Sequence, residues 1–113
     1  MISQREVQKI ISLLCGGISQ IFPQDKIEAI LFGSYARGEA GIGSDIDVLI
    51  LVDASRQMIA DKNWQIGCLA AEFLMDYGIV VSPIVENRDY FNTNIGLLPF
   101  YHNIHSEGVR ISA

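Results

Sequence analysis

Residues 33–52 have the sequence GSYARGEAGIGSDIDVLILV, which combines a glycine-rich polar loop with the strongest strand signal of the chain. The last seven residues, 46–52, are almost continuously apolar, as is typical of a central strand covered on both faces. Residues 27–32, just before the loop, predict a second strand. We therefore expect two neighbouring strands with a polar loop between them, in the middle of a sheet.

The flanking segments predict helices. Ser3 and Glu6 form a capping-box pair that starts a helix near residue 3. Gly16-Gly17 inside this helix either permits close packing against another element or marks a kink. Further helices are predicted from Asp53 or Ser55 to Gly78, around residues 88–92 and over residues 97–106, and further strands over 79–85 and 109–111. Pro83 cannot donate a ladder hydrogen bond, so the strand 79–85 is expected at a sheet edge or bulged. The order predicts an α/β fold, a small mixed sheet with flanking helices.

Composition limits the class of protein. The 113 residues are 50% apolar and 19% charged, which predicts one globular domain over residues 1–113. The net charge of −5 argues against strong nucleic-acid binding or attachment to an anionic membrane. No apolar run reaches the roughly 18 residues that suggest a transmembrane helix. Cys15 and Cys68 match no disulfide or metal spacing, so we expect buried free thiols and a cytoplasmic location.

One polar cluster carries chemistry. Asp45 and Asp47 are two positions apart at a strand start, so both carboxylates point to the same side, with Cα atoms about 6.5–7 Å apart. Two unpaired carboxylates repel each other, and Mg²⁺ would relieve that repulsion while it shares its other positions with phosphates. Gly33 and Ser34 lie at a strand-to-helix turn, where close backbone approach, N–H groups and a hydroxyl favour phosphate. Taken alone, the two aspartates also fit a solvated pair at a strand end.

The spacing of these residues resembles a known family. Gly33-Ser34, ten residues and then Asp45-Ile46-Asp47 is similar to the GS-x10-DxD pattern of the nucleotidyltransferase superfamily that includes DNA polymerase beta. The run GSYARG over residues 33–38 resembles the minimal nucleotidyltransferase (MNT) group. The resemblance implies the nucleotidyltransferase fold.

It also implies Mg²⁺-dependent transfer of a nucleoside monophosphate, as AMP from ATP, with release of pyrophosphate. Gly33, Ser34, Arg37 and Ser44 would then bind the nucleotide, and Asp45 and Asp47 would be the catalytic metal ligands. For Arg37, an ion pair with a neighbouring acid such as Glu39 is the structural alternative. The MNT group further implies a HEPN-type protein partner that the protein modifies or covers as an antitoxin, and a homo-oligomer is a further possible assembly.

The sequence departs from the family at one place. Many active members carry a third carboxylate on a strand beside the DxD strand, which here is 79–85. Its only polar side chain is Ser82, and Glu86 follows it. A hydroxyl cannot replace a carboxylate as a base. Two alternatives to the enzyme therefore stay open: a catalytically degenerate module that binds nucleotide or a partner, and a structural protein with a decayed site.

Weaker candidates have ordinary structural explanations beside the functional one. His102 and His105 have the spacing of a metal pair on a helix, or are surface histidines. Phe91, Phe100 and Tyr101 could stack an adenine ring, or belong to the core. Outside this group, Trp64 lies off the apolar stripe of its predicted helix and marks either a partner interface or packing under a loop.

Overall fold

The computed structural model describes residues 2–111 and contains a four-stranded mixed sheet in the order β3-β2-β1-β4. β1 is antiparallel to β2 and to β4, and β2 is parallel to β3. The strands are β1 (Glu28–Phe32), β2 (Ile46–Val52), β3 (Val81–Asn87) and β4 (Val109–Ile111). The mixed sheet is confirmed, and Pro83 lies in an edge strand as expected. β3 begins and ends two residues later than the predicted strand.

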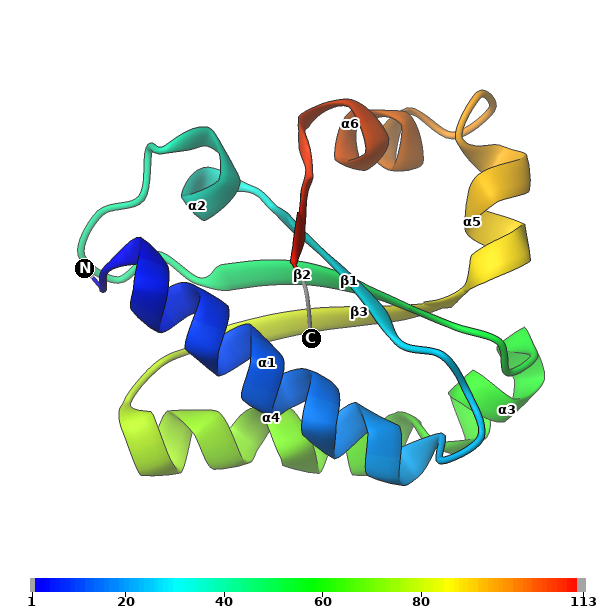
Figure 1. The fold of residues 1–113 in the computed structure, drawn as a ribbon, viewed down its shortest axis with the longest axis horizontal. Coiled ribbons are helices and arrows are strands. Elements are labelled where there is room, and N and C mark those ends of the chain that lie inside the picture. The colour runs from blue at the N-terminus through cyan, green and yellow to red at the C-terminus, as the bar shows by residue number, and fades with distance from the viewer. Residues whose placement is uncertain (1, 112–113) are drawn as a thin grey trace.

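Helices cover both faces of this sheet (Figure 1). α1 and α4 lie on one face and α5 and α6 on the other, while α2 follows the end of β1. The helices are α1 (Gln4–Ile21), α2 (Ser34–Arg37), α3 (Arg56–Asp61), α4 (Asn63–Tyr77), α5 (Arg88–Asn94) and α6 (Pro99–Glu107). The single helix expected before Gly78 is therefore wrong, because the chain breaks at Lys62 into α3 and α4. Both helices pack on β3, and α4 also packs on α1. Within residues 2–111, no helix combines the length and apolar character required to cross a bilayer.

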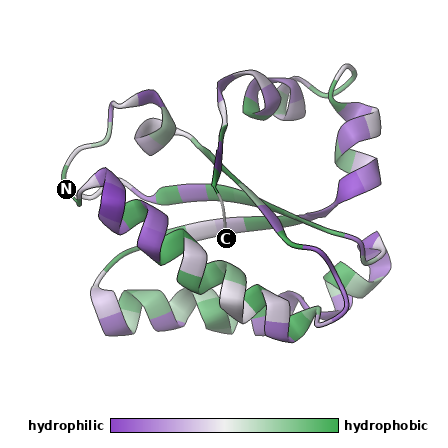
Figure 2. Cartoon of the chain, in the orientation of Figure 1, coloured by the Kyte–Doolittle hydropathy of each residue, from purple (hydrophilic) through white to green (hydrophobic). Residues whose placement is uncertain are grey.

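β2 forms the centre of two apolar layers, as its hydrophobic colouring in Figure 2 indicates. Val48, Ile50 and their neighbours of the same parity belong to the core on the α1 side. Leu49 and Leu51 belong to the core that contains residues of α5 and α6. Because side chains alternate along a strand, Asp47 points to the α5/α6 face, at the end of the row formed by Leu49 and Leu51.

α1 and α4 approach each other closely at a single glycine. The capping box predicted at Ser3 and Glu6 is present, and α1 runs unbroken through both glycines. A Cβ on Gly17 would lie 2.6 Å from a methyl carbon of Leu69 on α4, whereas a Cβ on Gly16 would meet nothing within 4 Å. Gly17 therefore permits close packing between the helices, and Gly16 does not serve that purpose.

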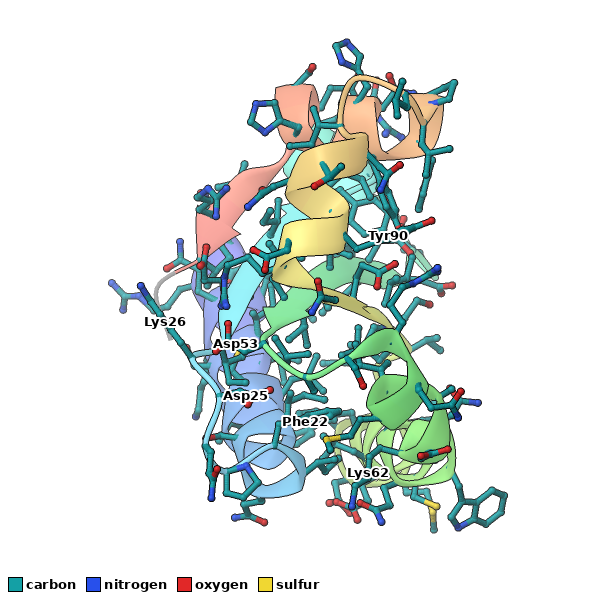
Figure 3. The ribbon with its side chains drawn as sticks, turned by 90° about the vertical axis from the view of Figure 1, so that its right-hand side faces the viewer. Phe22, Asp25, Lys26, Asp53, Lys62 and Tyr90 are labelled. Atoms are coloured by element: carbon teal, nitrogen blue, oxygen red, sulfur yellow. The ribbon has the colours of Figure 1, made fainter. Side chains whose placement is uncertain are left out.

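A network of charged side chains closes the end of the sheet where β2 finishes (Figure 3). Asp25, Lys26 and Asp53 lie together there, and the Asp25 carboxylate accepts hydrogen bonds from the backbone N–H groups of Asp53 and the next residue. Arg88 donates to Glu28 at 2.7 Å and pairs with Asp53. Burial acts to raise the pKa of Glu28, but its arginine partners lower it below the ordinary value. Because β2 begins at the other end, this network is remote from Asp47 and we assign it to structure.

Candidate functional site

The turn after β1 brings the backbone against a carboxylate. Gly33 turns the chain from β1 into the four-residue helix α2 with φ 78° and ψ −156°, a region nearly restricted to glycine. A Cβ at this position would lie 3.2 Å from Cβ and Cγ of Asp47 and closer still to Oδ2. Glycine is therefore required both by the turn and by the contact. Ser34 is the first residue of this helix, because Gly33 occupies the N-cap position.

Two aspartates meet at the start of β2. Asp47 is the second residue of the strand and is half-buried, and the exposed Asp45 lies directly before the strand. Burial raises the pKa of the Asp47 carboxyl, the charge of Asp45 raises it further, and Arg37 partly opposes the shift. None of the ion pairs between described residues includes either aspartate. The pair is therefore a concentration of negative charge that Arg37 offsets only in part.

The remaining predicted residues lie around this pair, with partners of their own. Arg37 Nε donates to Glu39 Oε1 at 2.6 Å, so the structural alternative for this arginine is present. The same hydrogen bond raises the pKa of Arg37, and the charges of Glu107 and Asp47 act in the same direction. The Ser44 hydroxyl accepts from a backbone N–H of the glycine-rich loop at 2.9 Å and closes the loop just before the aspartates.

The sequence match extends well beyond the turn and the aspartates. Residues 11–95 match the family model for the nucleotidyltransferase domain, which is most of the chain. The chain belongs to this nucleotidyltransferase family. The assignment confirms the expected fold, and the site just described occupies the part of this domain that carries the GS and DxD residues.

Three proteins of Methanocaldococcus jannaschii named "Putative protein adenylyltransferase" resemble this nucleotidyltransferase domain. MJ0604 is 40% identical over 79 residues, which are 70% of this chain and 71% of the relative. MJ0141 is 41% identical over 84 residues, covering 74% of this chain and 82% of the relative. MJ1305 is 44% identical over 71 residues, covering 62% of this chain and 48% of the relative.

The structure places the departure from the nucleotidyltransferase pattern beside Asp47. In the parallel ladder between β2 and β3, Asp47 is paired with Ser82, so this serine lies next to Asp47 on the strand where the family resemblance implied a third carboxylate. Among residues 2–111, no three His, Cys, Asp or Glu side chains form a group able to hold a metal ion. The site therefore has two acids and a hydroxyl.

Glu86 does not replace the absent carboxylate. It lies inside β3, opposite Leu51, rather than after the strand as expected. It lies four positions after Ser82, which is about 13 Å along a strand. Its carboxylate is buried and accepts from Tyr101 Oη at 2.5 Å, and it pairs with Arg56 at 3.3 Å. Glu86 therefore joins β3, α3 and α6, away from the aspartates.

Most of the weaker candidates prove to be ordinary. Phe91 is fully buried, which makes the stacking role wrong for it, and Tyr101 is committed to Glu86. Phe100 remains half-exposed and contacts Phe32 edge to face at 5.7 Å. His102 and His105 are both exposed on α6.

Two surface residues complete the comparison with the sequence. Cys15 is a buried free thiol as expected, but Cys68 is exposed, because it lies on the outer side of α4. Trp64 on the same helix is 82% exposed, which excludes packing under a neighbouring loop.

Sequence reasoning missed the contribution of Phe32 to this site, and it named Phe100 of α6 as a stacking candidate without placing that helix beside the aspartates. Phe32 is the register partner of Asp47 in the antiparallel ladder, so it borders the site on the side opposite Ser82. α6 lies more than fifty residues later in the chain and reaches the site only through the tertiary fold. Phe32 could have been found from the sequence, because it ends the predicted strand directly before the glycine turn. No neighbouring residues indicate that α6 packs beside the aspartates.

Proposed function

We propose that this protein transfers AMP from Mg-ATP to a hydroxyl group of an acceptor protein. The observation that carries the proposal is the contact between Gly33 and the Asp47 carboxylate, beside Asp45. It brings a backbone able to approach phosphate next to two acids able to hold a metal. The relatives' names, which describe protein adenylyltransferases, support adenosine as the nucleoside and a protein as the acceptor.

The residues present fit a divalent cation. Asp45 and Asp47 supply carboxylate oxygens, the ligands that Mg²⁺ prefers, and Mg²⁺ usually needs only one or two carboxylates when substrate phosphates complete its shell. The repulsion that raises the pKa of Asp47 is relieved when a cation lies between the two acids. When bound, the metal supplies charge neutralisation at the phosphates and orients the acceptor oxygen.

The chain's own residues act mainly by positioning. The Gly33 backbone and the Ser34 hydroxyl hold the β- and γ-phosphates, and Arg37 exchanges Glu39 for phosphate oxygens. The acceptor oxygen forms a bond to the α-phosphorus, the bond to the bridging oxygen breaks, and pyrophosphate leaves. Because Ser82 cannot serve as a base, we assign the hydroxyl proton to solvent. From the resemblance to the MNT group, we further propose that the acceptor is a HEPN-type protein and that this protein acts as its antitoxin.

The test uses ATP labelled on the α-phosphate. The protein is incubated with the labelled ATP, Mg²⁺ and lysate of its host. The controls are the double variant Asp45→Asn/Asp47→Asn and lysate that receives the label without added protein. We expect a discrete labelled protein band that requires both Mg²⁺ and the two aspartates, and that labelling on the γ-phosphate does not reproduce. A band that persists in the double variant would contradict the proposed site.

The pairing of Ser82 with Asp47 favours a second candidate, a module that binds Mg-nucleotide without transferring it. A positioned general base typically contributes about 10²- to 10⁴-fold to rate, so its loss reduces chemistry more than binding. The variant Ser82→Asp separates the candidates. Under the binding-module candidate, the natural protein binds Mg-ATP without labelling any acceptor and the variant gains transfer; efficient transfer by the natural protein removes this candidate.

A further inference from the structure

A cavity of about 260 Å³ opens between α6 and the glycine turn. Its lining combines two aromatic rings, two ionised side chains of opposite sign and one amide. The residues concerned are Phe32, Gly33, Arg37, Phe100, Asn103 and Glu107. Nucleotide-sized ligands usually need about 300–1,000 Å³. The cavity is therefore suited to part of a nucleotide rather than to the whole molecule.

The sheet register fixes where this cavity lies relative to the aspartates. Asp47 is flanked by Phe32 on β1 and by Ser82 on β3. Phe32 extends the aromatic surface to Phe100, whose ring meets it edge to face with centroids 5.7 Å apart. The cavity thus begins on the β1 side of Asp47, while the hydroxyl in the position of the third carboxylate lies on the β3 side.

Two walls of the cavity carry opposite charges, which fixes the orientation of a bound ligand. Gly33 and Arg37 form the wall nearest the proposed phosphate site. On the α6 wall, the carboxylate of Glu107 repels phosphate but accepts hydrogen bonds from an amine or a hydroxyl. A triphosphate is therefore disfavoured along α6, and a neutral group that donates hydrogen bonds is favoured there.

We propose that this cavity holds the nucleoside part of ATP, with the adenine ring stacked on Phe100 and its edge bound by Asn103. Aromatic rings stack nucleobases through their faces, and asparagine is a common partner of the adenine edge because its amide offers both a donor and an acceptor. The acceptor then approaches from the β3 side of Asp47, over Ser82. This inference rests on the proposed function, since it places the nucleoside of the same substrate.

The first test needs no variant. Dissociation constants are measured by calorimetry with Mg²⁺ for ATP, ribose 5-triphosphate and inorganic tripolyphosphate. Loss of one base–aromatic stack typically weakens binding about five-fold or more. We therefore expect ATP to bind at least about five-fold more tightly than ribose 5-triphosphate. Equal affinities for these two ligands would overturn the inference while the proposed phosphate and metal site stands.

The second test assigns the effect to α6. Phe100→Ala and Asn103→Ala should each weaken ATP binding about five-fold or more and leave tripolyphosphate binding unchanged. His102→Ala, an exposed position on the same helix, is the matched control and should bind both ligands as the natural protein does. Unchanged ATP affinity in both α6 variants, or a change confined to the KM of the acceptor, would overturn the inference.

Failure of the two proposals is distinguishable. If the natural protein binds neither ATP nor tripolyphosphate with Mg²⁺, the proposed function and the nucleoside site both fail. If Asp45→Asn/Asp47→Asn abolishes binding of both ligands but the α6 variants change nothing, only the nucleoside site fails. Thermal unfolding followed by circular dichroism accompanies each variant, and the comparison of ligands on the natural protein decides the question if a variant does not fold.

Discussion

Replacing Gly33 with alanine is the most direct test of the contact that organises the site. Two effects are built into this position. The backbone has φ 78° and ψ −156°, where residues other than glycine are strained, and the new methyl group would press on the carboxyl group of Asp47. Gly38→Ala is a matched control, because Gly38 also has a positive φ of 71° but a Cβ there would meet nothing within 4 Å.

The two variants differ in the size and kind of their effects. Strain costs about 1–3 kcal/mol at Gly33 and about 1–2 kcal/mol at Gly38. Each kcal/mol lowers Tm by about 4 °C in a domain of this size. At Gly33 the carboxylate must also move, by about 1 Å, to reach ordinary contact distance. A misplacement of that size can cost about 10²-fold in rate, so Gly33→Ala should lose far more transfer than Gly38→Ala.

The assay compares the two variants with the natural protein at a temperature at which all three are folded. Thermal unfolding gives the stability, calorimetry gives the affinity for Mg-ATP, and labelled ATP gives transfer. We expect Gly38→Ala to lose stability alone and Gly33→Ala to lose stability, affinity and transfer. If folded Gly33→Ala binds and transfers as well as Gly38→Ala, the contact with Asp47 is not part of a nucleotide site.

Three further predictions concern stability. Asp47→Asn should raise Tm at pH 7 without metal. The folded pKa of Asp47 is raised, so ionisation of this carboxyl destabilises the folded protein as pH rises above about 4. Added Mg²⁺ should stabilise only the natural protein. Glu28 has a lowered folded pKa, so its stabilisation is complete above about pH 4.3 and lost as pH falls through the folded value. Glu28→Gln should therefore make urea unfolding less sensitive to pH below that point. Gly16→Ala should stabilise by about 0.5–1 kcal/mol in urea unfolding and Gly17→Ala by less, because only the latter must displace a leucine.

The central part of the fold could be predicted because its signals are local. The apolar run of β2 and the capping box of α1 are each encoded by a few neighbouring residues, and both were found at the expected positions. Gly78 also ends a helix as predicted, with its backbone in the left-handed region. The break at Lys62 could not be predicted, because the division between α3 and α4 depends on how both helices pack on β3, which lies later in the chain.

The site was predictable to a similar extent. Gly33 and Asp47 lie near each other because β1 and β2 are consecutive, paired strands joined by one loop, and this arrangement is predictable from the local sequence. Glu86 was expected after the strand but lies inside it, because the end of β3 depends on pairing with β2 and the boundaries of a strand are weakly encoded. Phe100 was named from the sequence as a stacking candidate, but the cavity beside it could not be located, since it needs α6 to pack over the end of β1 and no residue spacing reports that contact.

The arrangement around Asp47 separates binding of the nucleotide from delivery of the acceptor. Phe32 on one side leads to the aromatic cavity, and Ser82 on the other side takes the place of the third carboxylate. Under the proposed function, the departure from the family therefore falls on the side from which the acceptor hydroxyl approaches. A serine in place of the carboxylate removes an interaction made mainly in the transition state. It therefore lowers kcat and changes the affinity for ATP little. Under the proposed function, a change on the Ser82 side therefore separates affinity for Mg-ATP from rate of transfer, so both have to be measured.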